Sequence, residues 1–129
     1  MAVFSIAVGN AILDAVETAI GSGPYLILYD EPQPANTTDA DVGNALATLP
    51  LPANWMANAQ NRLKSLSATW SDLSAEAAGV PAGFAIKQGS VVHIRGTASA
   101  TGVTGELRFT NTPFQEGQRI NITQFDFEI

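Results

Sequence analysis

Hydrophobic residues recur at every fourth position near the start of the chain and predict a helix over residues 4–20. The row consists of Phe4, Val8, Ile12, Val16 and Ile20. Ser5 is suited to cap the start of this helix, and the Gly-Ser-Gly-Pro sequence at 21–24 is suited to end it. We expect this helix either to pack on the sheet of its own chain or to dock on a neighbouring subunit.

The rest of the chain has mainly β-type patterns. Residues 25–29, Tyr-Leu-Ile-Leu-Tyr, are apolar on both faces and predict a central strand. A short strand is expected at 45–51, and alternating patterns predict further strands at 84–87, 91–95, 106–110 and 119–129. Residues 62–78 are ambiguous, and 71–78 suit either a short helix or an extended strand.

Two local features refine the β pattern. Gly89-Ser90 lies between two alternating segments and is typical of a type II′ hairpin turn. In the last segment the apolar positions shift phase after Ile122 and resume at Phe125. Because a strand has a period of two, this shift predicts a β-bulge near Thr123-Gln124.

These elements together predict a mainly β fold, an antiparallel β-sandwich or jelly roll with one N-terminal α-helix. The length of 129 residues fits a single domain, 1–129. Within it we distinguish an N-terminal helical arm, 1–24, and a β body, 25–129, with irregular loops at 30–43 and 52–60.

Charge is distributed unevenly. The net charge is −6, and the first 61 residues contain six acids and no lysine or arginine, whereas the remainder is neutral. A basic footprint is needed to neutralise phosphates, so the composition argues against nucleic-acid partners and against docking on an anionic membrane. The chain has no basic segment typical of a signal peptide, and its apolar runs are too short to span a bilayer.

Reactive chemistry is sparse. Cysteine is absent, and the single histidine, His93, lies in a β pattern beside Arg95 without a nucleophile motif. Asp39 and Asp41 form a weak Asp-x-Asp pattern, with Asp30 and Glu31 nearby, and whether an ion such as calcium binds there is left open. We therefore expect no enzyme, and we nominate no catalytic, cofactor-binding or metal-binding residue.

A family resemblance is carried by the order of the segments. The segments are Ala-Ile-Leu-Asp-Ala at 11–15, Tyr-Leu-Ile-Leu-Tyr-Asp at 25–30, Ala-Leu-Ala-Thr-Leu-Pro at 45–50, Val-His-Ile-Arg-Gly-Thr at 92–97 and Glu-Gly-Gln-Arg-Ile-Asn-Ile-Thr-Gln-Phe at 116–125. In this order the chain resembles small virion structural proteins of tailed phages and prophages. It is similar to capsid cement (decoration) proteins. The resemblance covers most of the chain and is weakest over 53–82.

The resemblance implies a protein of the capsid exterior that stabilises the phage head through contacts between subunits. Its implied partners are the major capsid protein and further copies of itself in a homotrimer, without nucleic acid, membrane or cofactor. Interfaces are enriched in aromatic residues and methionine. The candidate interface residues are Phe4, Val8 and Ile12 on the helix and Trp55, Met56 and Phe114 as exposed loop anchors.

Two other functions remain open. A phage tail or baseplate structural protein has much the same sequence features as a cement protein and would differ in copy number. A carbohydrate-binding β-sandwich module is the other alternative, and it requires aromatic rings that are exposed together on one face. The rings available for that purpose are Tyr25, Tyr29, Trp55 and Trp70.

Overall fold

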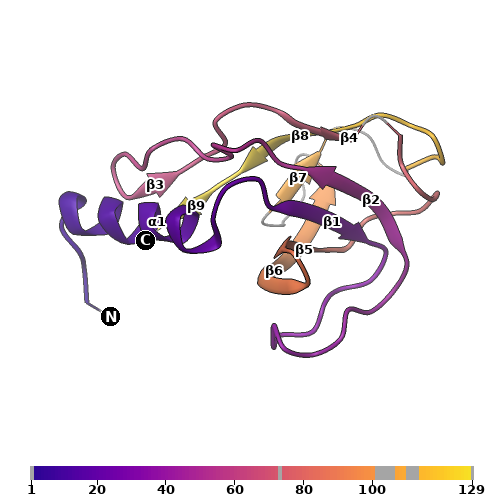
Figure 1. Ribbon diagram of the computed structural model, residues 1–129, viewed down its shortest axis with the longest axis horizontal. Helices are drawn as coiled ribbons and strands as arrows, with labels where there is room; N and C mark the ends of the chain where they lie inside the picture. Colours follow the sequence, from indigo (N-terminus) through magenta and orange to yellow (C-terminus); the bar gives the residue numbers. More distant parts are fainter. Residues whose placement is uncertain (1, 73, 101–106, 110–113, 129) are drawn as a thin grey trace.

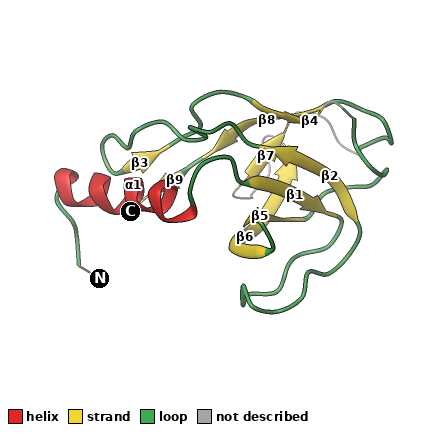
Figure 2. Cartoon of the chain, in the orientation of Figure 1, coloured by secondary structure: helices red, strands yellow, loops and turns green. Residues whose placement is uncertain are grey.

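A computed structural model describes residues 2–72, 74–100, 107–109 and 114–128 (Figures 1 and 2). One helix is followed by nine strands in this part of the chain. Their bounds are α1 Ile6–Ile20, β1 Tyr25–Tyr29, β2 Ala45–Pro50, β3 Leu63–Lys64, β4 Trp70–Asp72, β5 Gly83–Gln88, β6 Val91–Ala100, β7 Leu107–Phe109, β8 Ile120–Phe125 and β9 Phe127–Glu128. The mainly β class with one N-terminal helix is as predicted.

The helix begins and ends at the residues that the sequence indicates. The hydroxyl of Ser5 accepts a hydrogen bond from the backbone N–H of Val8 at 3.2 Å, which caps the first turn. At the other end Gly21 has a φ of 96°, and its N–H donates to the carbonyl of Glu17. Both predicted signals are confirmed.

Seven strands form one sheet in the order β2-β1-β5-β6-β7-β8-β4. The strand β1 pairs antiparallel with both β2 and β5, so its central position is confirmed. The β5–β6 hairpin turns at Gly89-Ser90, where Gly89 has a φ of 63° and Ser90 is not in the positive-φ region. This pattern fits the predicted type II′ turn.

The predicted β-bulge is present in β8. Arg108 pairs with Gln124, whereas the next residue, Phe109, pairs with Ile122, so Thr123 is the extra residue. The insertion places Ile122 and Phe125 in the core although they are three positions apart.

The two edges of the seven-stranded sheet approach each other. Outside its pairing with β1, the strand β2 contacts β4 and the segment that follows it. The carboxylate of Asp72 accepts from the N–H of Thr48 at 3.1 Å, and the N–H of Glu76 donates to the carbonyl of Leu46 at 2.8 Å. The sheet is therefore rolled on itself around one core.

These pairings do not confirm the predicted β-sandwich or jelly roll. The only other sheet among the described residues is the short β3–β9 pair, which lies beside α1 (Figure 1). The pairing of β6 with β7 is parallel, which alternating patterns alone do not reveal. Residues 70–72 of the ambiguous segment form β4, and the described residues after them, 74–78, belong to neither a helix nor a strand.

Large aromatic rings fill the rolled sheet. Trp55 lies 6.0 Å from Trp70 between ring centroids, and Trp70 lies 5.6 Å from Phe125. Phe84 meets Phe125 edge-on at 5.3 Å. These four side chains are almost completely buried, and the indole N–H groups donate to the carbonyls of Gly21 and Trp55. Rings from distant segments thus join the β body and the end of α1 in one core.

Candidate interaction surface

The hydrophobic row predicted on the helix divides between two faces. Ile20 is buried in the core and Val16 packs against it, whereas Phe4, Val8 and Ile12 are exposed by 41%, 49% and 37%. Successive positions four apart rotate by about 40° because the helix has 3.6 residues per turn. From Val8 to Ile20, the part of the row that lies in α1, the rotation reaches about 120°, so the two ends of the row face different sides of the helix. The helix therefore packs on its own chain through Val16 and Ile20, and the first half of the row stays exposed.

Several exposed apolar side chains lie on the outward side of α1, and Phe4 precedes its N-cap. We call this surface the outer patch and define it by Phe4, Ala7, Val8, Ala11, Ile12, Ala15 and Ala19, all of which are exposed. It contains no charged side chain. Its four alanines, each four residues from the next, form one row along the helix. Figure 1 shows α1 at the end of the molecule, with one side directed away from the sheet. Exposed apolar surface of this kind is typical of a protein–protein contact.

The inward face of α1 is bound largely through polar groups. Asn10 accepts from the N–H of Arg62 at 2.8 Å, and Asp14 accepts from the N–H of Ala59 at 2.8 Å. One turn further on, Glu17 accepts from the N–H of Met56 at 3.2 Å. Three consecutive helical turns thus satisfy backbone donors of the irregular segment 56–62, and this fixes which face of the helix looks inward.

A buried lysine completes this contact. Lys64 is 1% exposed, and its ammonium lies 2.7 Å from Asp14, 3.1 Å from Glu17 and 3.0 Å from the carbonyl of Ala57. The hydrogen bond from Lys64, together with that from the backbone of Ala59, lowers the pKa of Asp14 below its usual value. Because an ammonium in the interior must be paired, a rotation of the helix that moved Asp14 and Glu17 away would leave Lys64 uncompensated.

The N-terminal end of the outer patch is held by a strained turn. Asn61 and Arg62 have φ values of 53° and 63° between the paired residues Gln60 and Leu63, which fits a type I′ turn. The guanidinium of Arg62 donates to the carbonyl of Phe4 at 3.1 Å. A non-glycine residue in this region costs energy, and the contacts that Arg62 makes with Asn10 and Phe4 offset it.

Three predicted loop anchors are not at the surface. Trp55 and Met56 are 0% exposed and Phe114 is 1% exposed, so the expectation that they are exposed is wrong. Trp55 and Met56 lie where the segment after β2 crosses the core, and the backbone of Phe114 pairs with that of Gly79. The sequence shows large apolar residues in irregular segments but does not show that these segments cover the open parts of the rolled sheet.

The long loop at 30–43 is anchored at its far end by Asp41. Its carboxylate accepts from the hydroxyl of Tyr29 at 2.6 Å, and it also accepts from the ammonium of Lys87 and the guanidinium of Arg95. Arg95 additionally donates to the backbone carbonyls of Asn36 and Asp39. These contacts fasten the loop to β5 and β6, so the loop is ordered without regular secondary structure.

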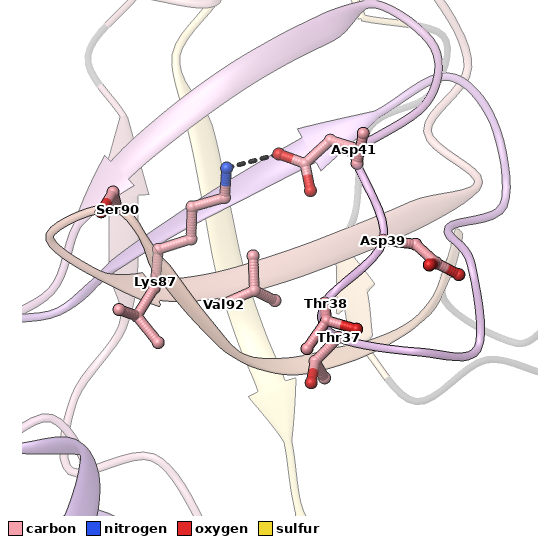
Figure 3. A pocket seen from close by; sticks show the side chains of 9 residues that line it. Thr37, Thr38, Asp39, Asp41, Lys87, Ser90 and Val92 are labelled. Carbon is pink, nitrogen blue, oxygen red and sulfur yellow. Dashed lines mark hydrogen bonds and ion pairs between the residues drawn. The ribbon is translucent and has the colours of Figure 1, made fainter.

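A cavity of about 510 Å³ lies between this loop and the β5–β6 hairpin, as Figure 3 shows. The ammonium of Lys87 points to Asp41 at one side of the cavity, and the hydroxyl groups of Thr37 and Thr38 lie at the other. Val92 lies between them. Because the carboxylate of Asp41 is already bound by two cations and a hydroxyl, it is not a free ligand for a metal ion.

The charges of this cluster shift two pKa values. Partial burial raises the pKa of Asp41, but the hydrogen bonds from Lys87, Tyr29 and Arg95 outweigh this effect and lower the pKa to about 2. Burial and the neighbouring carboxylate raise the pKa of Tyr29. Both pKa shifts favour an ionised carboxylate on Asp41 and a neutral phenol on Tyr29. These are the charge states in which the two side chains hold the loop in place.

Other chemical groups remain apart. His93 is exposed on β6, and within 2–72, 74–100, 107–109 and 114–128 no three His, Asp or Glu side chains are grouped so that they could hold a metal ion. No helix in these ranges is long and apolar enough to cross a membrane.

No family model, curated protein or solved structure matches the chain. Among the described residues, the outer patch and the loop held by Asp41 are candidate surface features.

Replacing Lys64 by methionine should lower the free energy of unfolding by about 3 kcal/mol, because Asp14 and Glu17 would repel each other beside an apolar side chain. Urea denaturation followed by tryptophan fluorescence measures the change, since Trp55 and Trp70 are buried. Arg119→Met is the matched control because Arg119 is exposed, and it should alter stability by less than about 0.5 kcal/mol. Equal effects of the two substitutions would show that Lys64 does not hold the helix.

Replacing Asp41 by asparagine should make the free energy of unfolding fall less between neutral pH and pH 2 than it does in the wild type. The folded pKa of Asp41 is lowered, so its contribution is present above about pH 4 and is lost as the pH falls towards 2. The stability difference between wild type and variant should therefore shrink over this range, from about 2 kcal/mol near neutral pH. Denaturation curves at several pH values test this, with Asp39→Asn in the same loop as a control. A difference that is constant between pH 5 and pH 2 would contradict the assignment.

Proposed function

We propose that this chain is a viral structural protein, a cement (decoration) protein of a phage head, and that it acts without catalysis by docking on neighbouring subunits. The observation that carries the proposal is the outer patch, an uncharged apolar surface on a helix whose polar face is already bound inside the molecule. Burying such a surface against a neighbour is favourable by roughly 25 cal/mol per Å². A shell presents the same neighbour many times, so a modest contact is multiplied.

The distribution of charge supports the same role. Lys64, Lys87 and Arg95 are bound to acids within the molecule. Many of the remaining acids are exposed, among them Glu31, Asp39, Glu76, Glu116 and Asp126. The surface away from the outer patch is therefore predominantly acidic. Such a surface suits the outside of a shell, away from packaged nucleic acid.

A carbohydrate-binding module receives less support from the positions of the aromatic rings. Trp55 and Trp70 are buried in the core, and Tyr29 is 5% exposed. Tyr25 is half-buried and donates its hydroxyl to the carbonyl of Gly89 at 2.6 Å. The four rings do not form an exposed platform on which a sugar could stack.

A tail or baseplate protein uses the same kind of interface, and copy number distinguishes it from a cement protein. Quantitative mass spectrometry of purified particles should find the chain at a simple symmetric ratio to the major shell protein. A few copies per particle would indicate a tail or baseplate component. Absence from particles would overturn the assignment to a virion.

A double substitution, Val8→Glu with Ile12→Glu, should reduce the number of copies per particle by about tenfold or more, because docking would bury two unpaired carboxylates. Both residues are exposed, so the fold should be retained, as circular dichroism would show. Val91→Glu is the matched control, because Val91 is 55% exposed on the β5–β6 hairpin. Normal incorporation of the double variant would exclude the outer patch as the docking surface.

A further inference from the structure

The cavity between the loop at 30–43 and the β5–β6 hairpin has no role in the proposed function. Its volume of about 510 Å³ lies within the roughly 300–1,000 Å³ that is typical of small-molecule sites. Asp41 fastens the loop to Lys87 of β5 and Arg95 of β6, so this wall of the cavity is in place before a ligand arrives. A site that is already formed loses little binding free energy to the ordering of its walls.

The charged groups beside the cavity carry one more positive than negative charge. The side chains of Lys87 and Arg95, which are 16% and 4% exposed, share the carboxylate of Asp41. An ammonium has three N–H donors, and within the described part of the chain Asp41 is the only partner of Lys87. Figure 3 shows the carboxylate of Asp39 directed away from this ammonium. Lys87 therefore has donors left for a ligand carboxylate, which would balance the excess charge.

The opposite side of the cavity presents hydroxyl groups. The hydroxyl of Thr38 donates to the side-chain carbonyl of Asn36 at 2.9 Å, and its oxygen can still accept a hydrogen bond. In the residues that the structure describes, the hydroxyl of Thr37 has no partner. Val92 is half-buried and lies between the two sides (Figure 3). A complementary ligand thus has a carboxylate at one end, hydroxyl groups at the other and an apolar face between them.

We infer that the cavity binds a sugar acid, a monosaccharide ring that carries one carboxylate. The carboxylate lies at the ammonium of Lys87, and the ring hydroxyls exchange hydrogen bonds with Thr37 and Thr38. The C–H face of the ring packs on Val92. This inference is independent of the proposed function. It also differs from a module with an exposed aromatic platform, because the described residues that line the cavity include no aromatic ring.

The acidic character of the whole chain does not prevent binding of an anion at this place. The net charge is −6, but salt screens exposed charges beyond about 8 Å at physiological ionic strength. The potential in the cavity is therefore set mainly by Lys87, Arg95 and Asp41. Because a partly exposed ion pair contributes little, we expect a dissociation constant on the order of millimolar.

NMR titration of the full chain at constant ionic strength tests the ligand class with three probes. Glucuronate should shift the amide signals of residues 37–41 and 90–92 with a dissociation constant on the order of millimolar. Glucose lacks the carboxylate and acetate lacks the ring, so each should bind at least about tenfold more weakly. No binding of glucuronate up to about 100 mM, or equal binding of acetate, would overturn the inference.

Substitutions then test the position of the ligand. Lys87→Gln removes the charge but keeps an N–H donor, so it should weaken glucuronate binding at least about tenfold and leave glucose binding unchanged. Thr37→Val should weaken the binding of both sugars about threefold or more, because it removes one hydroxyl. Arg119→Gln is the control, because it removes an exposed cation elsewhere, and it should change neither affinity.

The two lining substitutions fail independently of each other. Thr37→Val leaves the contacts of Asp41 intact, so it remains informative if circular dichroism shows that Lys87→Gln disturbs the fold. Glucuronate affinity that Thr37→Val leaves at the wild-type value would place the ligand outside this cavity and overturn the inference. A folded Lys87→Gln variant that loses glucose and glucuronate affinity equally would also overturn it, because the ammonium would then not bind the carboxylate.

Discussion

The buried ammonium of Lys64 is the constraint on which the arrangement of this protein depends. An amine that is 1% exposed needs anionic partners, and Asp14 and Glu17 on α1 are the carboxylates that lie beside it. Their position fixes the rotation of the helix, so that its polar side faces the β body. Val8 and Ile12, with the row of exposed alanines beside them, are consequently left outside. The exposed apolar surface of α1 is thus a consequence of the helix orientation that pairs Lys64 with Asp14 and Glu17.

Local structure could largely be read from the sequence because it depends on local signals. The Ser5 cap, the Gly21 terminus and the Gly89 turn each follow from the conformational preferences of one or two residues. The bulge at Thr123 follows from a change of phase in the apolar pattern, which any half-buried strand makes visible. These features need no knowledge of what lies across the fold.

The candidate sites depend on contacts between distant segments and could be predicted only in part. Nothing in the local pattern shows that Lys64 pairs with acids 47 and 50 positions away, or that Asp41 binds cations on β5 and β6. The hydrophobic residues at every fourth position near the start of the chain suggested a single helix face. A row with this spacing winds slowly around a helix of 3.6 residues per turn. The burial of Trp55 likewise depends on how the sheet rolls, which is set by the contacts of β2 with the segment at 72–77. Exposure of Phe4, Val8 and Ile12 is compatible with their nomination as interface residues, and their role remains a prediction.

The orientation of α1 is tested most directly by the reactivity of single cysteines at adjacent helical positions, since the wild-type chain has none. Ile12 is 37% exposed and Leu13 is 4% exposed. A maleimide probe applied to dilute native protein should therefore label Ile12→Cys at nearly the rate of the denatured variant. Leu13→Cys should be protected at least about a hundredfold, because labelling there requires local opening of the structure. Rapid labelling at position 13 with protection at position 12 would mean that Ile12 faces inward and Leu13 outward, which would contradict an orientation set by Lys64.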